Sequence, residues 1–424
     1  AWHLADEKFM DFSNDWMDEF KLRFSLGQTG NSASGASLYL GSYASGNNYM
    51  DMSAITPSSM QLNKLKWETT TEYNTGLDAT FLKGKLRFTV DVYQKYVKDL
   101  LQPKVKMPTT IGYGNGYQIS YMNSGKMTNK GWEFRVDAVP FQNKDWRVGV
   151  YFNIAHNENK ITEMPDNYIE ENYTFGNGNY AYRREEGRPM GSFYGYRYKG
   201  VYQNKDATYA RDIEGNVMKD ISGNAIVMRN GSYTVAPGDA IYEDVNHDGV
   251  INQYDIVYLG NSNPRLTGGA GLNVSYKQFK LSAIFYGRYG QDVVNATRLN
   301  NESMRGIDNQ STAVLRRWRN EGDQTDIPRA LYGEGYNTLG SDRFVEDASY
   351  LRLKSLSFTY RLPKKAIQRW GFNNIDVYVT GYNLFTWTNY TGQDPEVKTE
   401  NTYAKDTATT PASIQLVAGF NLSF

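Results

Sequence analysis

The segment from Asp244 to Asp255 has the residue types and spacing of a cation site. Oxygen-bearing side chains occupy its first, third, fifth, ninth and twelfth positions, and Gly249 stands at the sixth, where a calcium-binding loop turns sharply. The sequence therefore predicts a Ca²⁺ site, whose expected ligands are Asp244, Asn246, Asp248, the Val250 carbonyl and Asp255.

Two features keep a second interpretation of this segment open. Asp255 is one methylene shorter than the glutamate that usually closes such a loop, and no flanking helices are evident. An Asp/Asn/Gly-rich turn that caps itself with side-chain hydrogen bonds would have the same composition.

Other chemistry is hard to place in this sequence. Cys 0 excludes thiolate catalysis and thiolate metal sites, the three histidines are widely separated, and no catalytic constellation stands out, so no enzyme is predicted. Equal numbers of basic and acidic residues, 46 each, argue against a nucleic-acid binder. Clustered loop tyrosines could stack on sugars or peptides or pack in a loop core: Tyr194, Tyr196, Tyr198 and Tyr202. The sequence does not indicate which residues bind substrate.

The dominant pattern along the chain has a period of two residues, which is typical of strands. Ten segments show it: Phe20–Gly30, Trp67–Phe81, Leu86–Tyr93, Trp132–Ala138, Trp146–Ile154, Leu266–Tyr276, Phe279–Gly290, Ser349–Arg361, Asn374–Trp387 and Ala412–Phe424. Between Leu353 and Leu356 the phase slips by one residue, as a β-bulge would produce. Alternation alone would also fit a half-solvated sheet of a soluble protein.

The connections favour a membrane barrel over that soluble sheet. Short turns are expected at Leu82–Gly84, Pro140–Lys144, Lys277–Gln278 and, somewhat longer, Leu362–Asn373. They alternate with long loops at Asn31–Lys64, Gln102–Tyr121, Thr162–Arg265, Gln291–Ala348 and Thr388–Pro411. Short periplasmic turns and long extracellular loops are typical of outer-membrane barrels, whose outward faces are apolar and whose lumen is polar. The expected lumen residues are Glu72, Asp78, Arg87, Asp91, Arg135 and Asp137.

The last strand ends in an aromatic residue. Phe420, Leu422 and Phe424 share one face, and this pattern resembles the signal that the outer-membrane assembly machinery recognises. The alternative is an ordinary last strand that happens to end in phenylalanine. An even number of strands would place the C-terminus on the periplasmic side.

Several segments, in order, resemble the C-terminal barrel portion of SusC/RagA-type TonB-dependent outer-membrane transporters. They are Leu65–Glu68, Asn74–Asp78, Asn123–Gly125, Asn129–Glu133, Glu186–Tyr196, Gly238–Asp239, Asn263–Arg265, Ala348–Leu353, Gly381–Phe385 and Asp394–Glu396. The resemblance implies an all-β fold, with residues 1–424 supplying about ten C-terminal strands of a 22-stranded transmembrane antiparallel barrel. It also implies localisation in the outer membrane.

The resemblance further implies a function and partners. Such transporters import oligosaccharides or oligopeptides with force from TonB and pair with a SusD-like surface lipoprotein. The N-terminal plug, the TonB-contacting segment and the first strands are not in this chain, which opens without a signal peptide, so we expect an upstream segment. Three alternatives stay open: a self-contained ten-stranded porin or surface barrel, a siderophore or cobalamin transporter, and a secreted carbohydrate-binding protein.

Overall fold

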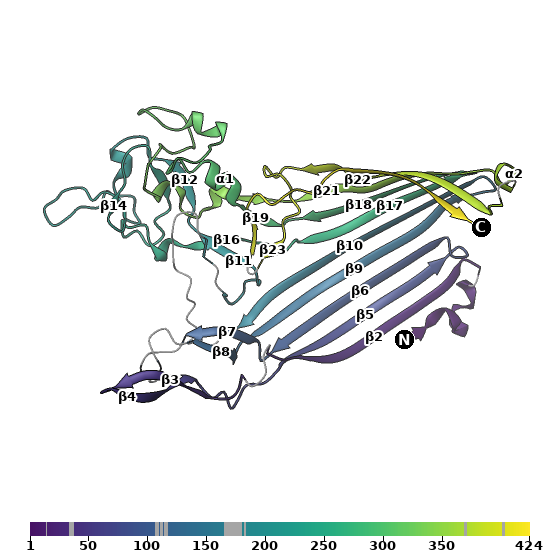
Figure 1. The fold of residues 1–424 in the computed structure, drawn as a ribbon, viewed down its shortest axis with the longest axis horizontal. Helices are drawn as coiled ribbons and strands as arrows, with labels where there is room; N and C mark the ends of the chain where they lie inside the picture. The colour runs from purple at the N-terminus through teal and green to yellow at the C-terminus, as the bar shows by residue number, and fades with distance from the viewer. Residues whose placement is uncertain are drawn as a thin grey trace.

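The structure is a computed structural model that describes residues 1–13, 15–33, 38–106, 110, 113, 118–164, 180–181, 184–368, 371–400 and 403–424. An 11-stranded sheet forms a long wall (Figure 1). Its order is β1 (Trp2–His3), β2 (Met17–Asn31), β5 (Glu68–Phe81), β6 (Leu86–Lys98), β9 (Lys126–Gln142), β10 (Trp146–Glu163), β17 (Leu266–Tyr276), β18 (Phe279–Tyr289), β21 (Tyr350–Arg361), β22 (Asn374–Thr388) and β25 (Gln415–Ser423).

Every neighbouring pair in the wall is antiparallel, and each strand follows the previous wall strand along the chain. All ten predicted strands are present, and the two-residue β1 is added at one edge. Within the described residues the order runs from β1 to β25 without closing into a ring. The fold is therefore all-β, and the wall is part of a barrel.

The register keeps apolar side chains in rows across the wall. Val90 pairs with Leu77 of β5 on one side and with Phe134 of β9 on the other. Leu22 of β2 continues this row and is 38% exposed, and Phe24 and Phe420, in other apolar rows of the wall, are 66% and 68% exposed. The clusters of buried hydrophobic residues lie mainly in the loops, and no second layer of the described chain covers the apolar face. Hydrocarbon is the medium that suits such a face.

The predicted bulge is present in β21. Strand β18 pairs Ile284 with Ser355 and then Phe285 with Leu353, so Lys354 is the extra residue. Because of this extra residue, Arg352 and Lys354 point to the same side as the later polar residues of the strand, while the apolar row stays on the outside.

Short turns and long loops lie at opposite ends of the wall, and both chain termini lie at the short-turn end (Figure 1). The turn between β5 and β6 has Leu82, Lys83 and Gly84 all in the left-handed region, with φ of 58°, 58° and 76°. The connection between β21 and β22 holds α2 (Lys364–Ile367). The predicted turn Pro140–Lys144 starts too early, because Pro140 to Gln142 still belong to β9.

Strand bounds were predicted too short at the loop end. Strand β9 begins at Lys126, not Trp132, and β10 continues to Glu163, not Ile154. These extensions are polar, and their residues do not alternate in hydropathy because they pass beyond the apolar band.

The predicted long loops contain small sheets of their own. They are β3 (Ser42–Tyr49) with β4 (Met52–Ser59), β7 (Leu101–Lys106) with β8 (Gln118–Asn123), β11 (Ser192–Gly195) with β16 (Val257–Asn261), β12 (Tyr198–Val201) with β15 (Ala240–Tyr242), and β13 (Arg229–Asn230) with β14 (Tyr233–Thr234). A further sheet has the order β20 (Val345–Asp347), β19 (Asp292–Asn295), β24 (Tyr403–Asp406) and β23 (Thr399–Glu400).

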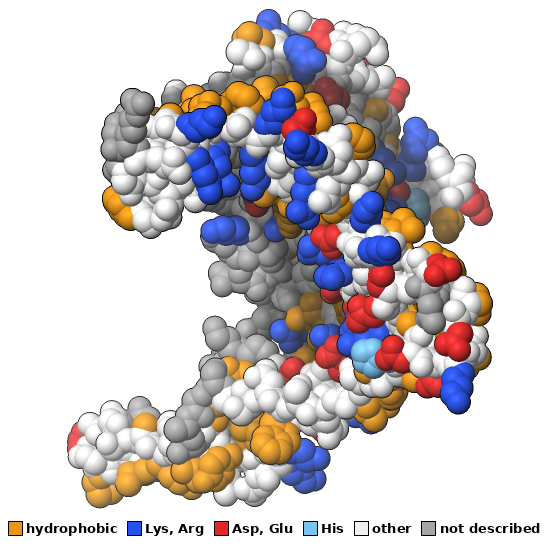
Figure 2. All heavy atoms as spheres, turned by 90° about the vertical axis from the view of Figure 1, so that its right-hand side faces the viewer, with side chains coloured by type: hydrophobic (Ala, Val, Ile, Leu, Met, Phe, Trp, Pro, Cys, Tyr) orange, Lys and Arg blue, Asp and Glu red, His pale blue; other side chains and the backbone are white. Residues whose placement is uncertain are grey.

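Short helices complete the loop end. They are α1 (Ala296–Asn301) and 3₁₀ turns at Asp206–Thr208, Gln253–Asp255, Thr312–Arg316, Tyr336–Thr338 and Asp342–Phe344; two more 3₁₀ turns, Leu4–Asp6 and Lys8–Ser13, precede β2. No helix in the described part of the chain is long and apolar enough to cross a membrane. Viewed from the short-turn end, the molecule is curved like a C, with hydrophobic side chains along much of its outer rim (Figure 2).

Candidate functional site

The inner face of the wall carries ion pairs that run across strands. Arg23 of β2 donates to Asp78 of β5 at 2.7 Å and to Asp91 of β6 at 3.0 Å. Glu72 pairs with Lys95 at 3.3 Å. The predicted lumen residues thus share one face, and the register also sets Arg87 opposite Asp137, which bonds Arg135 at 2.7 Å. Such a face suits a water-filled lumen.

Gly76 makes room for the Arg23 pair. A Cβ atom at Gly76 would lie 2.5 Å from both Arg23 Nη2 and Asp91 Oδ1. Any larger residue would push the guanidinium away from its carboxylates, so glycine is needed at this close approach.

The predicted calcium loop caps itself with its own backbone. The Asp244 carboxylate accepts from the Gly249 N–H at 2.8 Å and from the Asp248 N–H at 3.2 Å. Asn246 Oδ1 accepts from the same Asp248 N–H at 3.2 Å, and Asp248 Oδ1 accepts from the Val250 N–H at 2.8 Å. The side chains at positions one, three and five therefore face a common turn.

The twelfth position lies differently. Both Asp255 oxygens accept backbone N–H groups at 2.8 Å, from Val245 and Asn252, and the residue is fully buried. Burial raises the pKa of Asp255, and the nearby Asp244 carboxylate adds to the increase. In the described part of the chain, no three His, Cys, Asp or Glu side chains gather as metal ligands. The hydrogen bonds are those of the self-capped turn.

The clustered tyrosines of the long loop form a core and do not line an open surface. Tyr194 and Tyr196 are buried, and Tyr196 packs on Tyr242 with ring centroids 5.6 Å apart. Beside this core, the buried Asp239 carboxylate accepts from Arg329 Nε at 2.7 Å. Residues 165–179 and 182–183 of the predicted loop Thr162–Arg265 lie outside the described residues. The rest is a folded unit that covers the loop end of the wall.

The loop between β22 and β25, which we call the latch loop (residues 388–414), is tied to the inner face of the wall. Arg352 donates to Asp394 at 2.5 Å and to Glu396 at 2.7 Å, and Lys354 donates to Glu396 at 2.6 Å. The Arg352 side chain is only 4% exposed. The bulge at Lys354 allows both cations to reach the same loop segment.

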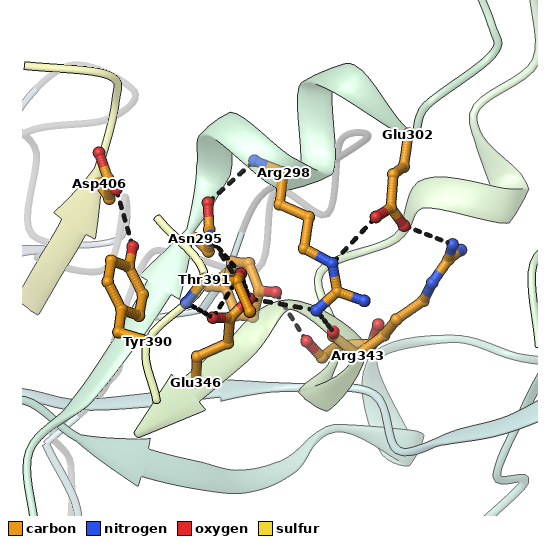
Figure 3. A network of polar contacts seen from close by, with 10 residues as sticks. Asn295, Arg298, Glu302, Arg343, Glu346, Tyr390, Thr391 and Asp406 are labelled. Carbon is orange, nitrogen blue, oxygen red and sulfur yellow. Dashed lines mark hydrogen bonds and ion pairs between the residues drawn. The ribbon is translucent and has the colours of Figure 1, made fainter. Parts of the chain in front are cut away.

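A second network ties the latch loop to the loop sheets (Figure 3). Glu346 of β20 accepts from the Thr391 N–H at 2.9 Å and from Arg298 Nη1 at 3.1 Å. Arg298 also bonds Glu302 at 3.0 Å, and Glu302 in turn accepts from Arg343 at 2.8 Å. Burial alone would raise the pKa of Glu346, but the Thr391 hydrogen bonds and the Arg298 cation outweigh burial and lower it.

Between the latch loop and the wall lies a cavity of about 790 Å³. Its lining includes Arg288 of β18, Asp394, Glu396, Lys398 and Lys405, together with Thr407, Thr409 and Thr410. These residues come from two segments of the latch loop and from one wall strand, which are far apart in the sequence. No local sequence motif could therefore have indicated the cavity. Asp394–Glu396 and the segment Ala348–Leu353, which contains Arg352, were both recognised in the sequence, but their pairing was not predicted, and Lys354 lies outside the recognised segments.

The predicted assembly signal lies on the edge strand β25. Phe420 pairs with Val377 and Leu422 with Ile375 of β22, and all three signal residues are exposed. The Phe424 ring packs on Phe372 with centroids 4.9 Å apart. This placement leaves the signal residues accessible at the short-turn end.

Comparison with known proteins identifies the wall. Residues 10–384 match the family model described as TonB dependent receptor-like, beta-barrel. TonB-dependent receptor P3 of Formosa agariphila is 31% identical over 411 residues, which are 95% of this chain and 38% of that protein. TonB-dependent receptor SusC of Bacteroides thetaiotaomicron is 29% identical and is matched by 100% of this chain over 39% of its own length.

A solved structure agrees with these relatives. The structure of the RagAB peptide transporter matches 100% of this chain and 42% of its own chain, at 28% identity and a TM-score of 0.74. The chain thus spans about two-fifths of the length of the relatives that it matches. With its apolar outer face, polar inner face and folded loop end, the chain belongs to the TonB-dependent receptor β-barrel family of outer-membrane proteins and is similar to SusC and to the RagAB transporter.

Proposed function

We propose that this chain forms the wall and part of the extracellular mouth of a TonB-driven importer for oligopeptides or oligosaccharides. The observation that carries the proposal is the two-faced wall, with cross-strand ion pairs inside and apolar rows outside. A relative named SusC and a structure titled a peptide transporter support import, and we infer no enzymatic step.

The open edges of the sheet support a larger barrel than this chain alone. Unpaired backbone groups at β1 and β25 would face hydrocarbon, at a cost of several kcal/mol for each group. We infer that strands from the rest of the protein close the barrel, and that the plug and the TonB-contacting segment lie there too.

Uptake assays test this proposal against the self-contained porin. Cells that express the full-length transporter should take up a fluorescent oligopeptide or oligosaccharide only when TonB is present. Uptake that continues unchanged without TonB would contradict the proposal. Refolding of residues 1–424 alone into a heat-modifiable barrel in detergent would favour the porin.

A SusD-like lipoprotein is the proposed partner at the mouth. Two turns with the same Asp-Ile-x-Gly-Asn pattern, at 212–216 and 220–224, present Ile213 and Ile221 almost fully to solvent. Asp212 and Asp220 each accept the N–H two and four residues later, which holds both turns rigid. Exposed apolar residues on rigid turns suit a protein interface.

Co-purification tests the docking surface. Replacing both isoleucines with aspartate should reduce recovery of the lipoprotein with the tagged full-length transporter. A matched control replaces Ile307, 92% exposed on another loop, with aspartate. Equal recovery from the double variant and the wild type would exclude these two turns as the docking surface.

We also propose that Ca²⁺ stiffens the segment Asp244–Asp255. The proposal rests on the spacing of Asp244, Asn246 and Asp248, whose oxygens already face one turn. Asp255 would contribute from the buried side only if a cation shared its oxygens with the Val245 and Asn252 N–H groups.

We propose that Phe420, Leu422 and Phe424 carry the assembly signal, supported by their exposure on the last strand. Deleting Phe424 from the full-length protein should lower the amount inserted in the outer membrane. Substituting Ser423 with alanine is the control. Full insertion after the deletion would contradict the assignment.

A further inference from the structure

We propose that the cavity beneath the latch loop is a binding subsite for an oxyanion, a carboxylate or sulfate group carried by the imported oligomer. The inference rests on the proposed import function and adds the charge of the substrate to it. The cavity has about 790 Å³ and opens between β18 of the wall and the residues 394–398 and 405–412 of the latch loop.

The charges around this cavity do not cancel. Its two acids, Asp394 and Glu396, are paired with Arg352 and Lys354 of the wall. Arg288, Lys398 and Lys405 also line it, and among the described residues no acidic side chain lies within ion-pair distance of these three cations. Among the described residues, the five cations (Arg288, Lys398 and Lys405 of the lining, with Arg352 and Lys354 beside it) outnumber the two carboxylates by three, in a chain whose net charge is +0.

The position of the three free cations suits a ligand that lies between wall and loop. Arg288 is on the wall, where its Nε bonds the Tyr286 hydroxyl at 3.2 Å and its other guanidinium N–H groups stay available. Lys398 and Lys405 are on the two limbs of the latch loop and are exposed. Lys405 lies between the buried Ala404 and Asp406 of β24, so its side chain points away from the loop core.

Hydroxyl groups add neutral hydrogen-bond donors on the latch-loop side of the cavity. Thr407, Thr409 and Thr410 line it beside the lysines. Charge-assisted hydrogen bonds from cations to carboxylate or sulfate are about twice as strong as neutral ones. A positively charged hollow also raises the local concentration of an anionic substrate before it binds. A neutral oligomer would gain neither effect.

Binding measured on the purified full-length transporter in detergent tests the inference. Calorimetry would compare tetraglutamate and tetragalacturonate with two neutral probes, end-blocked tetraglutamine and maltotetraose. At least one acidic probe should bind more tightly than its neutral counterpart, and its affinity should fall as salt is raised. The double variant Lys398→Gln/Lys405→Gln should bind that probe roughly tenfold more weakly, about 1.4 kcal/mol.

The matched control is the double variant Lys144→Gln/Lys205→Gln, which changes two exposed lysines far from the cavity in the sequence. This variant should bind the acidic probe as tightly as the wild type does. Preference for one acidic probe identifies its source, peptide or glycan, and either preference supports the subsite. Equal binding of acidic and neutral probes, no binding of either acidic probe, or an unchanged affinity in the Lys398/Lys405 variant would overturn it. Uptake of a neutral oligomer by wild-type cells that requires TonB would show that import stands even if this subsite fails.

Discussion

Arg352 of the wall strand β21 bonds Asp394 of the latch loop at 2.5 Å, and both side chains are largely shielded from solvent. Asp394 is held further by the backbone N–H groups of Glu396 and Ala412, each at 2.9 Å. Although burial opposes it, these hydrogen bonds and the Arg352 cation lower the pKa of Asp394. The ion pair therefore fixes the latch loop against the wall and shapes the cavity between them.

Replacing Arg352 with alanine should release the latch loop. The change leaves Asp394 and Glu396 without their shared cation, and losing one partner of a buried ion pair costs about 3–5 kcal/mol. Limited proteolysis of the folded transporter should show faster cleavage within residues 388–414. The control is Arg361→Ala, whose Asp376 pair has a guanidinium 59% exposed and should contribute about 1 kcal/mol or less. Equal cleavage in both variants would show that the pair does not hold the loop.

Replacing Gly76 with alanine should destabilise the wall. The new Cβ would lie 2.5 Å from Arg23 Nη2, and relieving such crowding costs about 1–3 kcal/mol. Thermal unfolding of the full-length protein, followed by its heat-modifiable migration, measures the change. Gly27→Ala is the control, since nothing lies within 4 Å of its added Cβ. A Gly76 variant as stable as the Gly27 variant would refute the crowding.

The loop network around Glu346 should loosen in acid. Its folded pKa is lowered, so its ionised form contributes stability above the ordinary value of 4.5, and this contribution is lost as the pH falls through the lower folded value. Hydrogen exchange of residues 388–414 should therefore stay slow at pH 6 and rise below about pH 4.5. In Glu346→Gln the acid-induced step should be smaller. The same step in both proteins would assign it to another group.

Calcium should protect the segment Asp244–Asp255 from proteolysis if the proposed ion binds. Cleavage mapped in EDTA and in millimolar CaCl₂ should differ, and Asp248→Ala should abolish the difference. Because protonation of Asp255 competes with a cation and burial raises its pKa, protection should weaken as the pH falls. Identical cleavage maps with and without calcium would contradict calcium binding and favour the self-capped turn.

The strands of the wall could be predicted from the sequence because each one meets two different media. Alternation such as Leu86 to Tyr93 persists only where one side faces hydrocarbon, so the start of β6 was predicted correctly, whereas the strands were predicted too short at the polar loop ends of β6, β9 and β10. The slip at Lys354 was visible for the same reason. The loop core was not predictable, since its buried cluster includes both Tyr194 and Tyr336, which are more than a hundred residues apart in the sequence.

The candidate site, like the fold, could be predicted from the sequence only in part. Positions within the segment Asp244–Asp255 could be read from their spacing, because a turn joins residues close in sequence. The contacts of Arg352 and the lining of the latch cavity depend on how β18, β21 and the latch loop are brought together. Local sequence patterns carry no information on such contacts.

Cysteine scanning of the full-length transporter tests the central claim, that the outward apolar rows of the wall contact lipid, most directly. The chain has Cys 0, so single cysteines at Phe88, Thr89, Val90 and Asp91 would each be the only thiol of this segment. We predict that cysteines at Phe88 and Val90 resist a membrane-impermeant maleimide in intact outer membrane, while those at Thr89 and Asp91 react. A uniform reaction along β6, or the opposite alternation, would contradict the account.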